Sequence, residues 1–113
     1  MAEHKLTLPD QFVVNALIYL SAGLIVPDGE QRMVIAEMSV QLKGCNWDNP
    51  RMAPLIDVAQ AFIEADAKPG TLRRDALFSA RMAAARVLTP FTLWRMGLIQ
   101  AAIASAPKTG AAA

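Results

Sequence analysis

Histidine and cysteine are nearly absent from this chain of 113 residues, which contains only His4 and Cys45. Most acid–base and nucleophilic sites depend on a histidine, a pair of carboxylates or an activated thiol. His4 lies near the first residue, and Cys45 follows the expected end of a helix, where the helix dipole raises the pKa of a thiol. No His–His or Cys–Cys spacing of a metal site occurs. We therefore predict a protein that is not an enzyme, with no catalytic residue, metal site, cofactor or small-molecule substrate.

A secretion signal, a long apolar run and a phosphate-binding glycine loop are also missing. The opening MAEHKLTLPD has no basic residues that lead into an apolar segment. Residues 12–26 are the most apolar stretch, but polar and small residues interrupt them, and a membrane-spanning helix needs about 20 residues. A second stretch, residues 87–106, contains Pro90 and Arg95. With no cysteine pair for an intramolecular disulfide, we predict a cytoplasmic protein without a membrane role.

Acidic residues are scarce in the second half of the chain. Residues 1–66 contain nine acidic and four basic residues, a net charge of −5, whereas residues 67–113 contain seven basic residues and only Asp75 as an acid, a net charge of +6. The two halves give the total of +1. A field of one sign attracts an opposite charge, so this asymmetry indicates a partner that is the other half, a second copy, another protein or nucleic acid.

Proline and glycine divide the chain into segments of helical length. No segment alternates between apolar and polar residues as a strand does. We predict an all-α protein, a compact bundle of about five helices without a sheet. It forms a single helical domain over residues 1–106, followed by a disordered tail at 107–113. The expected starts and stops are a cap at Thr7 with a helix to Ser21 or beyond, a helix over about 30–43 with a left-handed stop at Gly44, a helix from Ala53 or Pro54, a cap at Thr71, and a new helix at Thr89 and Pro90.

The apolar positions of these segments predict which sides are buried. The first helix is apolar nearly all round, so we expect it to be central and the most buried. The second helix has one apolar face, made of Met33, Val34, Met38 and Leu42. The third helix repeats apolar residues at helical spacing opposite three polar ones, with Leu55, Val58, Ala59, Phe62 and Ile63 facing inward.

The predicted fourth helix has apolar residues on two sides. One side is a stripe of small residues that lets another helix, the first or the fifth, come close: Ala76, Ala80, Ala83, Ala84 and Val87. Phe78 and Met82 share another side, about 150° from that stripe at 100° per residue. Such a helix is either enclosed by its own bundle or presents one side to a partner.

The apolar content favours a partner. At 54%, the hydrophobic fraction exceeds the roughly 45 to 50% of ordinary domains. We therefore predict a non-enzymatic protein–protein interaction module, such as an adaptor, a regulator or a phage- or plasmid-type inhibitor, that forms a homodimer or holds a protein partner through the fourth and fifth helices. The predicted partner-binding residues are Arg74, Phe78, Arg81, Met82 and Trp94.

The alternative is a DNA-binding regulator. The third helix, the turn at residues 66–70 and the basic helix over residues 71–88 would then form a helix-turn-helix, with Arg73, Arg74 and Arg81 reaching phosphates or base edges. The turn is longer than usual, and Phe78 and Met82 lie in the middle of the recognition face.

The regulator hypothesis predicts a salt-dependent loss of DNA binding in an Arg74→Ala, Arg81→Ala double variant. Removing two phosphate contacts should weaken binding and lower the slope of log affinity against log salt by about 2. Fluorescence anisotropy with labelled duplex DNA at several salt concentrations measures both. A parent chain that does not bind at low salt, or a double variant that binds as tightly as the parent, contradicts the hypothesis.

Overall fold

A capping box at Thr7 and Asp10 begins the first helix, α1 (Leu8–Ser21). The computed structural model describes residues 5–22 and 26–106. In it the backbone N–H of Asp10 donates to Thr7 Oγ1 at 3.1 Å, and the backbone N–H of Thr7 donates to Asp10 Oδ2 at 2.9 Å. Two of the N–H groups at the helix start are thereby satisfied. The predicted cap at Thr7 is present.

The carboxylate of Asp10 also connects α1 to a distant loop. Asp10 is fully buried, and its Oδ1 accepts a hydrogen bond from the backbone N–H of Asn46 at 3.0 Å. A buried carboxylate is costly unless it is hydrogen-bonded, and here both oxygens accept bonds from backbone N–H groups. The loop that leads into the third helix is therefore held at the start of the first.

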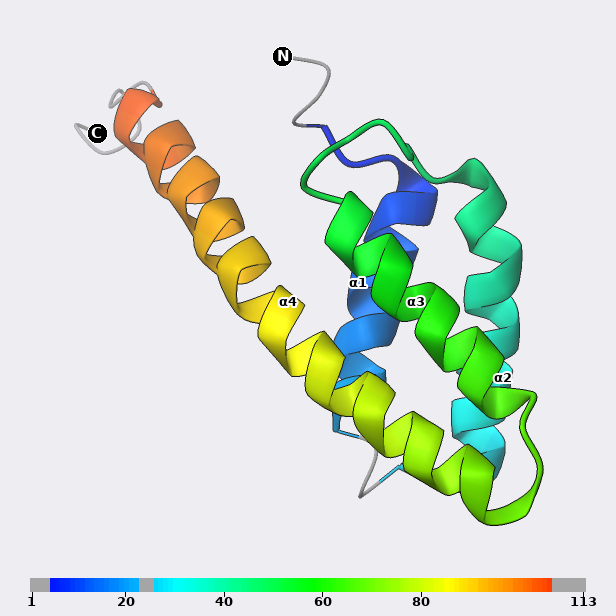
Figure 1. Ribbon diagram of the computed structural model, residues 1–113. Coiled ribbons are helices and arrows are strands. Elements are labelled where there is room, and N and C mark those ends of the chain that lie inside the picture. The colour runs from blue at the N-terminus through cyan, green and yellow to red at the C-terminus, as the bar shows by residue number, and fades with distance from the viewer. Residues whose placement is uncertain (1–4, 23–25, 107–113) are drawn as a thin grey trace.

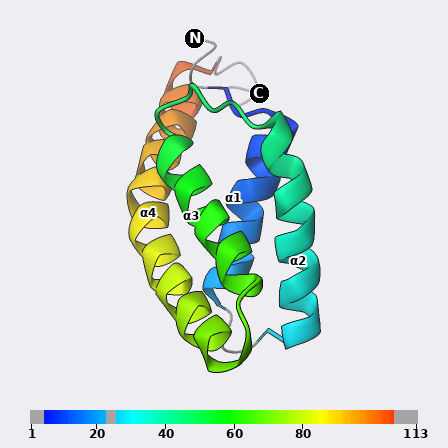
Figure 2. The ribbon, with the colours of Figure 1, turned by 45° about the vertical axis from the view of Figure 1, so that its right-hand side comes forward.

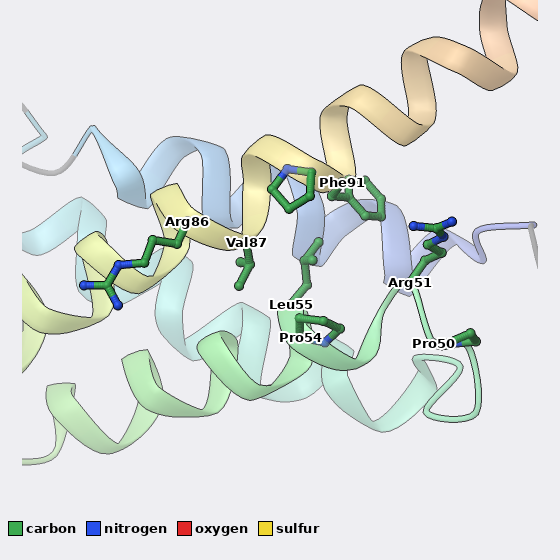
Figure 3. A pocket seen from close by; sticks show the side chains of 8 residues that line it. Pro50, Arg51, Pro54, Leu55, Arg86, Val87 and Phe91 are labelled. Carbon is green, nitrogen blue, oxygen red and sulfur yellow. The ribbon is translucent and has the colours of Figure 1, made fainter.

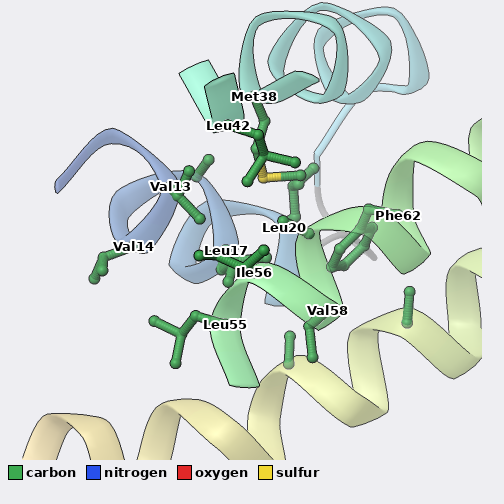
Figure 4. Packing of buried hydrophobic residues seen from close by; sticks show 14 of the residues in the cluster. Val13, Val14, Leu17, Leu20, Met38, Leu42, Leu55, Ile56, Val58 and Phe62 are labelled. Carbon is green, nitrogen blue, oxygen red and sulfur yellow. The ribbon is translucent and has the colours of Figure 1, made fainter. Parts of the chain in front are cut away.

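Helix α1 contacts all three of the other α-helices, as Figure 1 shows. Figure 4 shows the centre of the core, where Val13, Leu17 and Leu20 of α1 meet side chains from the helices that follow, among them Met38, Leu42, Leu55, Ile56 and Phe62. The opposite side of α1 carries the exposed Ile18 and Tyr19. The helix is central, as predicted, but it is not buried all round.

Helix α2 (Asp28–Gln41) turns most of the predicted face inward, with Val34 half-buried and Met38 buried, but not Met33. Its buried residues are Gln31, Ile35 and Met38, whereas Met33 is 73% exposed. The side-chain amide of Gln31 donates to the backbone oxygen of Val26 at 2.9 Å, which satisfies a polar group on the inner side. The prediction failed at Met33 because it ranked positions by hydrophobicity, and a hydrogen-bonded glutamine took the inner position.

Gly44 ends the short 3-10 helix η3 (Leu42–Gly44), and the left-handed stop predicted there is absent. Among the described residues, Gly70 alone has a positive φ, at +52°. Gly44 has another role, since a Cβ built on it would lie 2.8 Å from Cγ of Pro9. The absence of a side chain at Gly44 therefore lets η3 approach the first turn of α1.

Helix α3 (Ala53–Asp66) begins where the sequence predicts, and Leu55, Val58, Ala59 and Phe62 are buried. Helix α4 (Gly70–Ser105) follows after a short turn. Pro69 occupies its N-cap position, and Thr71 lies in its first turn without the capping role predicted for it. The chain reverses at Gly70 because glycine adopts a positive φ without steric cost.

Helix α4 runs unbroken through Pro90, so the described chain has four α-helices and η3 in place of the five helices predicted. An interior proline removes a backbone hydrogen bond and costs about 3 kcal/mol. Pro90 is exposed at the cavity between α3 and α4, and the buried Leu88 and Phe91 lie on either side of it in the sequence. Burying each of two such side chains is worth roughly 1.5 to 3 kcal/mol, which offsets that cost. The all-helical bundle is confirmed, with no strand in the described residues.

The length of α4 determines the shape of the molecule. At 1.5 Å per residue, its 36 residues span about 54 Å, whereas the 14 residues of α3 span about 21 Å. The molecule accordingly measures 60 × 29 × 21 Å. Figures 1 and 2 show α4 running past the other helices toward its C-terminal end.

A Gly44→Ala substitution tests the close approach of η3 and α1. The added methyl group must displace the ring of Pro9, so we expect a loss of about 1 to 3 kcal/mol in the free energy of unfolding. Chemical denaturation measures this loss. The control is Gly29→Ala, because a Cβ at Gly29 meets nothing within 4 Å and alanine favours the helix by roughly 0.5 to 1 kcal/mol. Equal effects of the two substitutions would contradict the packing role.

Candidate interaction surface on α4

The inner side of α4 is the predicted alanine stripe. Ala80 and Ala84 are buried, while Ala76, Ala83 and Val87 are half-buried against the core. Small side chains allow close approach of two helix backbones, and α4 uses them against α3 and α1. The inward direction of the stripe is confirmed; α3, which was not predicted, is the main neighbour of α4, and the first helix, one of the two predicted neighbours, also contacts it.

Arg73 fixes the start of α4 to two other helices. Its guanidinium donates to Asp66 Oδ1 from Nη2 at 2.8 Å and from Nε at 2.9 Å, and its Nη2 lies 3.0 Å from Asp28 Oδ1. Arg32 lies beside the same two carboxylates, 3.4 Å from Asp28 and 3.9 Å from Asp66. The side chain of Arg73 is only 13% exposed. One basic residue of the second half thus pairs with two acidic residues of the first half. Part of the opposite charge of the two halves therefore serves ion pairs within the chain.

The outer side of α4 is apolar and exposed. Phe78 is 54% exposed and Met82 is 46% exposed. The same side continues past Pro90 through further large side chains, and at 100° per residue all six lie within an arc of about 120° that points away from the alanine stripe. We call this group the outer face: Phe78, Met82, Leu93, Met96, Ile99 and Ile103.

The predicted site residues do not all belong to this outer face. Phe78 and Met82 do, and Arg74 and Arg81 lie along its edge, with Arg74 exposed and Arg81 half-buried. Trp94 lies on the bundle side, where its ring is 5.4 Å from that of Phe91 and the guanidinium of Arg51 is 5.1 Å from its centroid. Trp94 is therefore almost opposite Phe78 around the continuous helix and does not share its face.

Four residues of the outer face were not among the predicted partner-binding residues: Leu93, Met96, Ile99 and Ile103. They were left out because the sequence predicted a separate helix from Pro90 onward. Residues on that separate helix were not expected to share a face with Phe78 and Met82. The three- and four-residue spacing of the apolar residues from Leu93 to Ile103, on the same side as Phe78 and Met82, was the signal that could have revealed one continuous face.

An apolar cavity of about 290 Å³ lies on the bundle side of α4, between α4, α3 and the loop before α3. Figure 3 shows Pro54, Leu55, Val87 and Phe91 around the cavity, with Arg51 and Arg86 at its two ends. Its lining offers hydrophobic contact and two positive charges and contains no carboxylate, thiol or imidazole.

The surroundings of Cys45 do not activate its thiol. It is buried, and its Sγ lies 3.6 Å from the backbone oxygen of Gln41. Burial, followed by the nearby carboxylate of Asp10, raises the pKa of the thiol to about 12. Cys45 is therefore protonated at neutral pH and is a poor nucleophile. The described part of the chain has no cluster of three His, Cys, Asp or Glu residues that could hold a metal ion.

No protein-family model, curated protein or solved structure matches the chain. By length and composition, α4 is long and apolar enough to cross a membrane, and 11% of its most apolar 18-residue window is buried. The geometry of α4 therefore carries the functional argument.

The ion pairs of Arg73 predict how stability depends on pH. Hydrogen bonding to Arg73 holds the pKa of Asp28 below its ordinary value of 3.8. The pairing therefore stabilises the fold at pH values above 3.8, and this contribution is lost as the pH falls through the lower folded-state pKa.

We expect an Arg73→Gln variant to melt at a lower temperature than the parent at pH 7 and to lose less stability on acidification from about pH 5 to pH 3. Thermal melting followed by circular dichroism measures both effects. Arg74→Gln is the matched control, because the structure gives Arg74 no ion pair within the described residues. Parallel pH profiles for the parent and Arg73→Gln would show that these pairs do not govern the acid response.

Proposed function

We propose that this protein is a non-enzymatic protein–protein interaction module that self-associates and that binds through α4. The observation that carries the proposal is the outer face, six large apolar side chains exposed along one side of a single helix. Water-exposed apolar side chains scattered singly need no explanation, but a contiguous patch of this kind marks an interaction site.

The area of the outer face supports this proposal. Six side chains of this size, each about half exposed, present on the order of 100 Å² apiece, or about 600 Å² together. A patch of roughly 300 to 600 Å² is the largest that a typical monomer carries, and it is often functional. Hydrophobic burial, worth about 25 cal/mol per Å², is the main force available to such a surface.

The membrane alternative has less support from the geometry. The inner side of α4 is packed on the bundle as far as Trp94, so only the 11 residues from Arg95 to Ser105 extend beyond it. They span about 16 Å, whereas the hydrocarbon core of a bilayer is about 30 Å thick. Crossing a membrane would require pulling Leu88 and Phe91 out of the core.

The regulator alternative also has less support. Arg73, one of its three proposed DNA contacts, is occupied by Asp66 and Asp28. Arg81 is half-buried, and only Arg74 is exposed. A phosphate would have to displace two carboxylates to reach Arg73.

A Phe78→Gln variant tests the interaction module. Because Phe78 is exposed in the monomer, we expect the substitution to weaken self-association while the melting temperature of the monomer stays nearly unchanged. Light scattering at micromolar concentration should give a mass above the 12.2 kDa of one chain for the parent and close to it for the variant.

Ser79→Gln is the control, since Ser79 is exposed on α4 outside the outer face. It should leave the mass of the parent unchanged. The proposal is wrong if the parent is a monomer that captures no protein partner. It is also wrong if Phe78→Gln leaves assembly intact and costs the roughly 3 to 5 kcal/mol typical of truncating a buried phenylalanine.

A further inference from the structure

The outer side of α4 carries a regular seam. Going along the helix, exposed residues recur at alternating steps of four and three, which is the spacing of a coiled-coil interface. The eight positions of this seam are Phe78, Met82, Ala85, Thr89, Thr92, Met96, Ile99 and Ile103. All eight are exposed, and none contributes to the core of the bundle. The seam therefore contains every residue of the outer face except Leu93, together with the small Ala85, Thr89 and Thr92 that connect its two ends.

We propose that the occupant of this seam is the seam of a second copy of the chain, in antiparallel orientation, with the two-fold axis between Pro90 and Phe91. This inference rests on the proposed function and specifies its partner, direction and register. Three observations support it: the symmetry of the spacing, the positions of the arginines and the projection of α4 beyond the bundle.

The spacing of the seam is the same in both directions, four, three, four, three, four, three and four. An antiparallel copy therefore aligns all eight positions at once, so that the numbers of the two residues in each layer add up to 181. The layers are Phe78 with Ile103, Met82 with Ile99, Ala85 with Met96, and Thr89 with Thr92. Bulky residues fill the two ends, and the small Ala85 faces the long Met96. The centre of the interface is made of small threonines, which allows the helices to approach closely.

The arginines beside the seam favour the antiparallel direction. In a parallel pair, the flanking positions bring Arg81 of one copy next to Arg86 of the other, and symmetry repeats this contact. Like charges at such positions are destabilising. In the antiparallel register, Arg86 lies beside Leu93 of the second copy and Arg81 lies beside Ala102 of the second copy. The long arginine stems can then cover apolar surface while their charges stay in water.

The projection of α4 fits the same arrangement. Its first part, to Trp94, carries the bundle on its inner side, and its last 11 residues extend beyond the bundle. An antiparallel pair places the free end of each α4 along the exposed side of the other copy's covered part, with the two bundles at opposite ends. Leu93 of the second copy then lies over Arg86, at the mouth of the cavity in Figure 3.

The area is sufficient for a stable dimer. The large side chains contribute about 600 Å² per copy, and the small seam residues and the arginine stems add to this. The total approaches the roughly 800 Å² per partner of a standard interface.

Engineered cysteines test both direction and register. Thr89→Cys and Thr92→Cys are exposed single substitutions, and in the antiparallel register they face each other between two copies. A disulfide requires Cα atoms about 4.4 to 6.8 Å apart, so it reports contact in one layer only. After mild oxidation, the mixture of the two variants should form at least fivefold more covalent dimer than either variant alone. Mass spectrometry of the linked peptides identifies the bond.

The controls use the same chain. The parent has only the buried Cys45, so it should form no covalent dimer. A mixture of Thr89→Cys with Ser79→Cys should also fail to link, because these positions are out of register in either direction. Strong linkage of Thr89→Cys to itself would show a parallel dimer, which overturns the inference and leaves self-association standing.

Two other outcomes are possible: one overturns both proposals, and the other assigns the seam to a partner other than a second copy. A parent that stays at the mass of one chain at high micromolar concentration, with no linkage in the mixture, contradicts the antiparallel dimer and self-association together. Flotation of the parent with vesicles of phosphatidylcholine and phosphatidylglycerol, again without linkage between positions 89 and 92, assigns the seam to a lipid surface and overturns the second copy as its occupant.

Discussion

The difference in length between α4 and its neighbours is the constraint on which the rest of the structure depends. A helix of 36 residues cannot be covered by helices of 14 residues, so some of it must lie outside the bundle. The alanine stripe and the buried Leu88 and Phe91 use the inner side of α4 for as long as α3 and α1 lie beside it. Beyond Trp94 the bundle ends, while the helix continues with an apolar sequence. Exposure of that sequence follows from the architecture.

Two polar connections fix the position of the bundle's elements. At one, buried Asp10 accepts hydrogen bonds from the backbone at Thr7 and at Asn46, which ties α1 to the loop before α3. At the other, Arg73 joins the start of α4 to Asp66 at the end of α3 and to Asp28 at the start of α2. Because each connection links residues from separate elements, the hydrophobic core between them has one arrangement that satisfies both. The direction in which α4 leaves the bundle depends on the second connection.

The sequence predicts the fold where local signals and tertiary packing agree. Thr7 with Asp10 gave the start of α1, and the apolar period of α3 gave its buried face. Prediction failed where packing overrode a local signal. Pro90 is a strong helix breaker, but Leu88 and Phe91 hold the helix together by their burial. Two of the six residues of the outer face, Phe78 and Met82, were predictable, and the other four depended on knowing that Pro90 is interior.

The separation of the seam from the core has a consequence for regulation by abundance. Since no seam residue contributes to the core, folding of one chain does not require a second. Association of such a chain is governed by mass action, so a cell with few copies would contain folded monomers and a cell with many would contain assembled ones. A helix with matching spacing on another protein would compete for the same surface. The state of assembly would then report the ratio between the chain and its competitors.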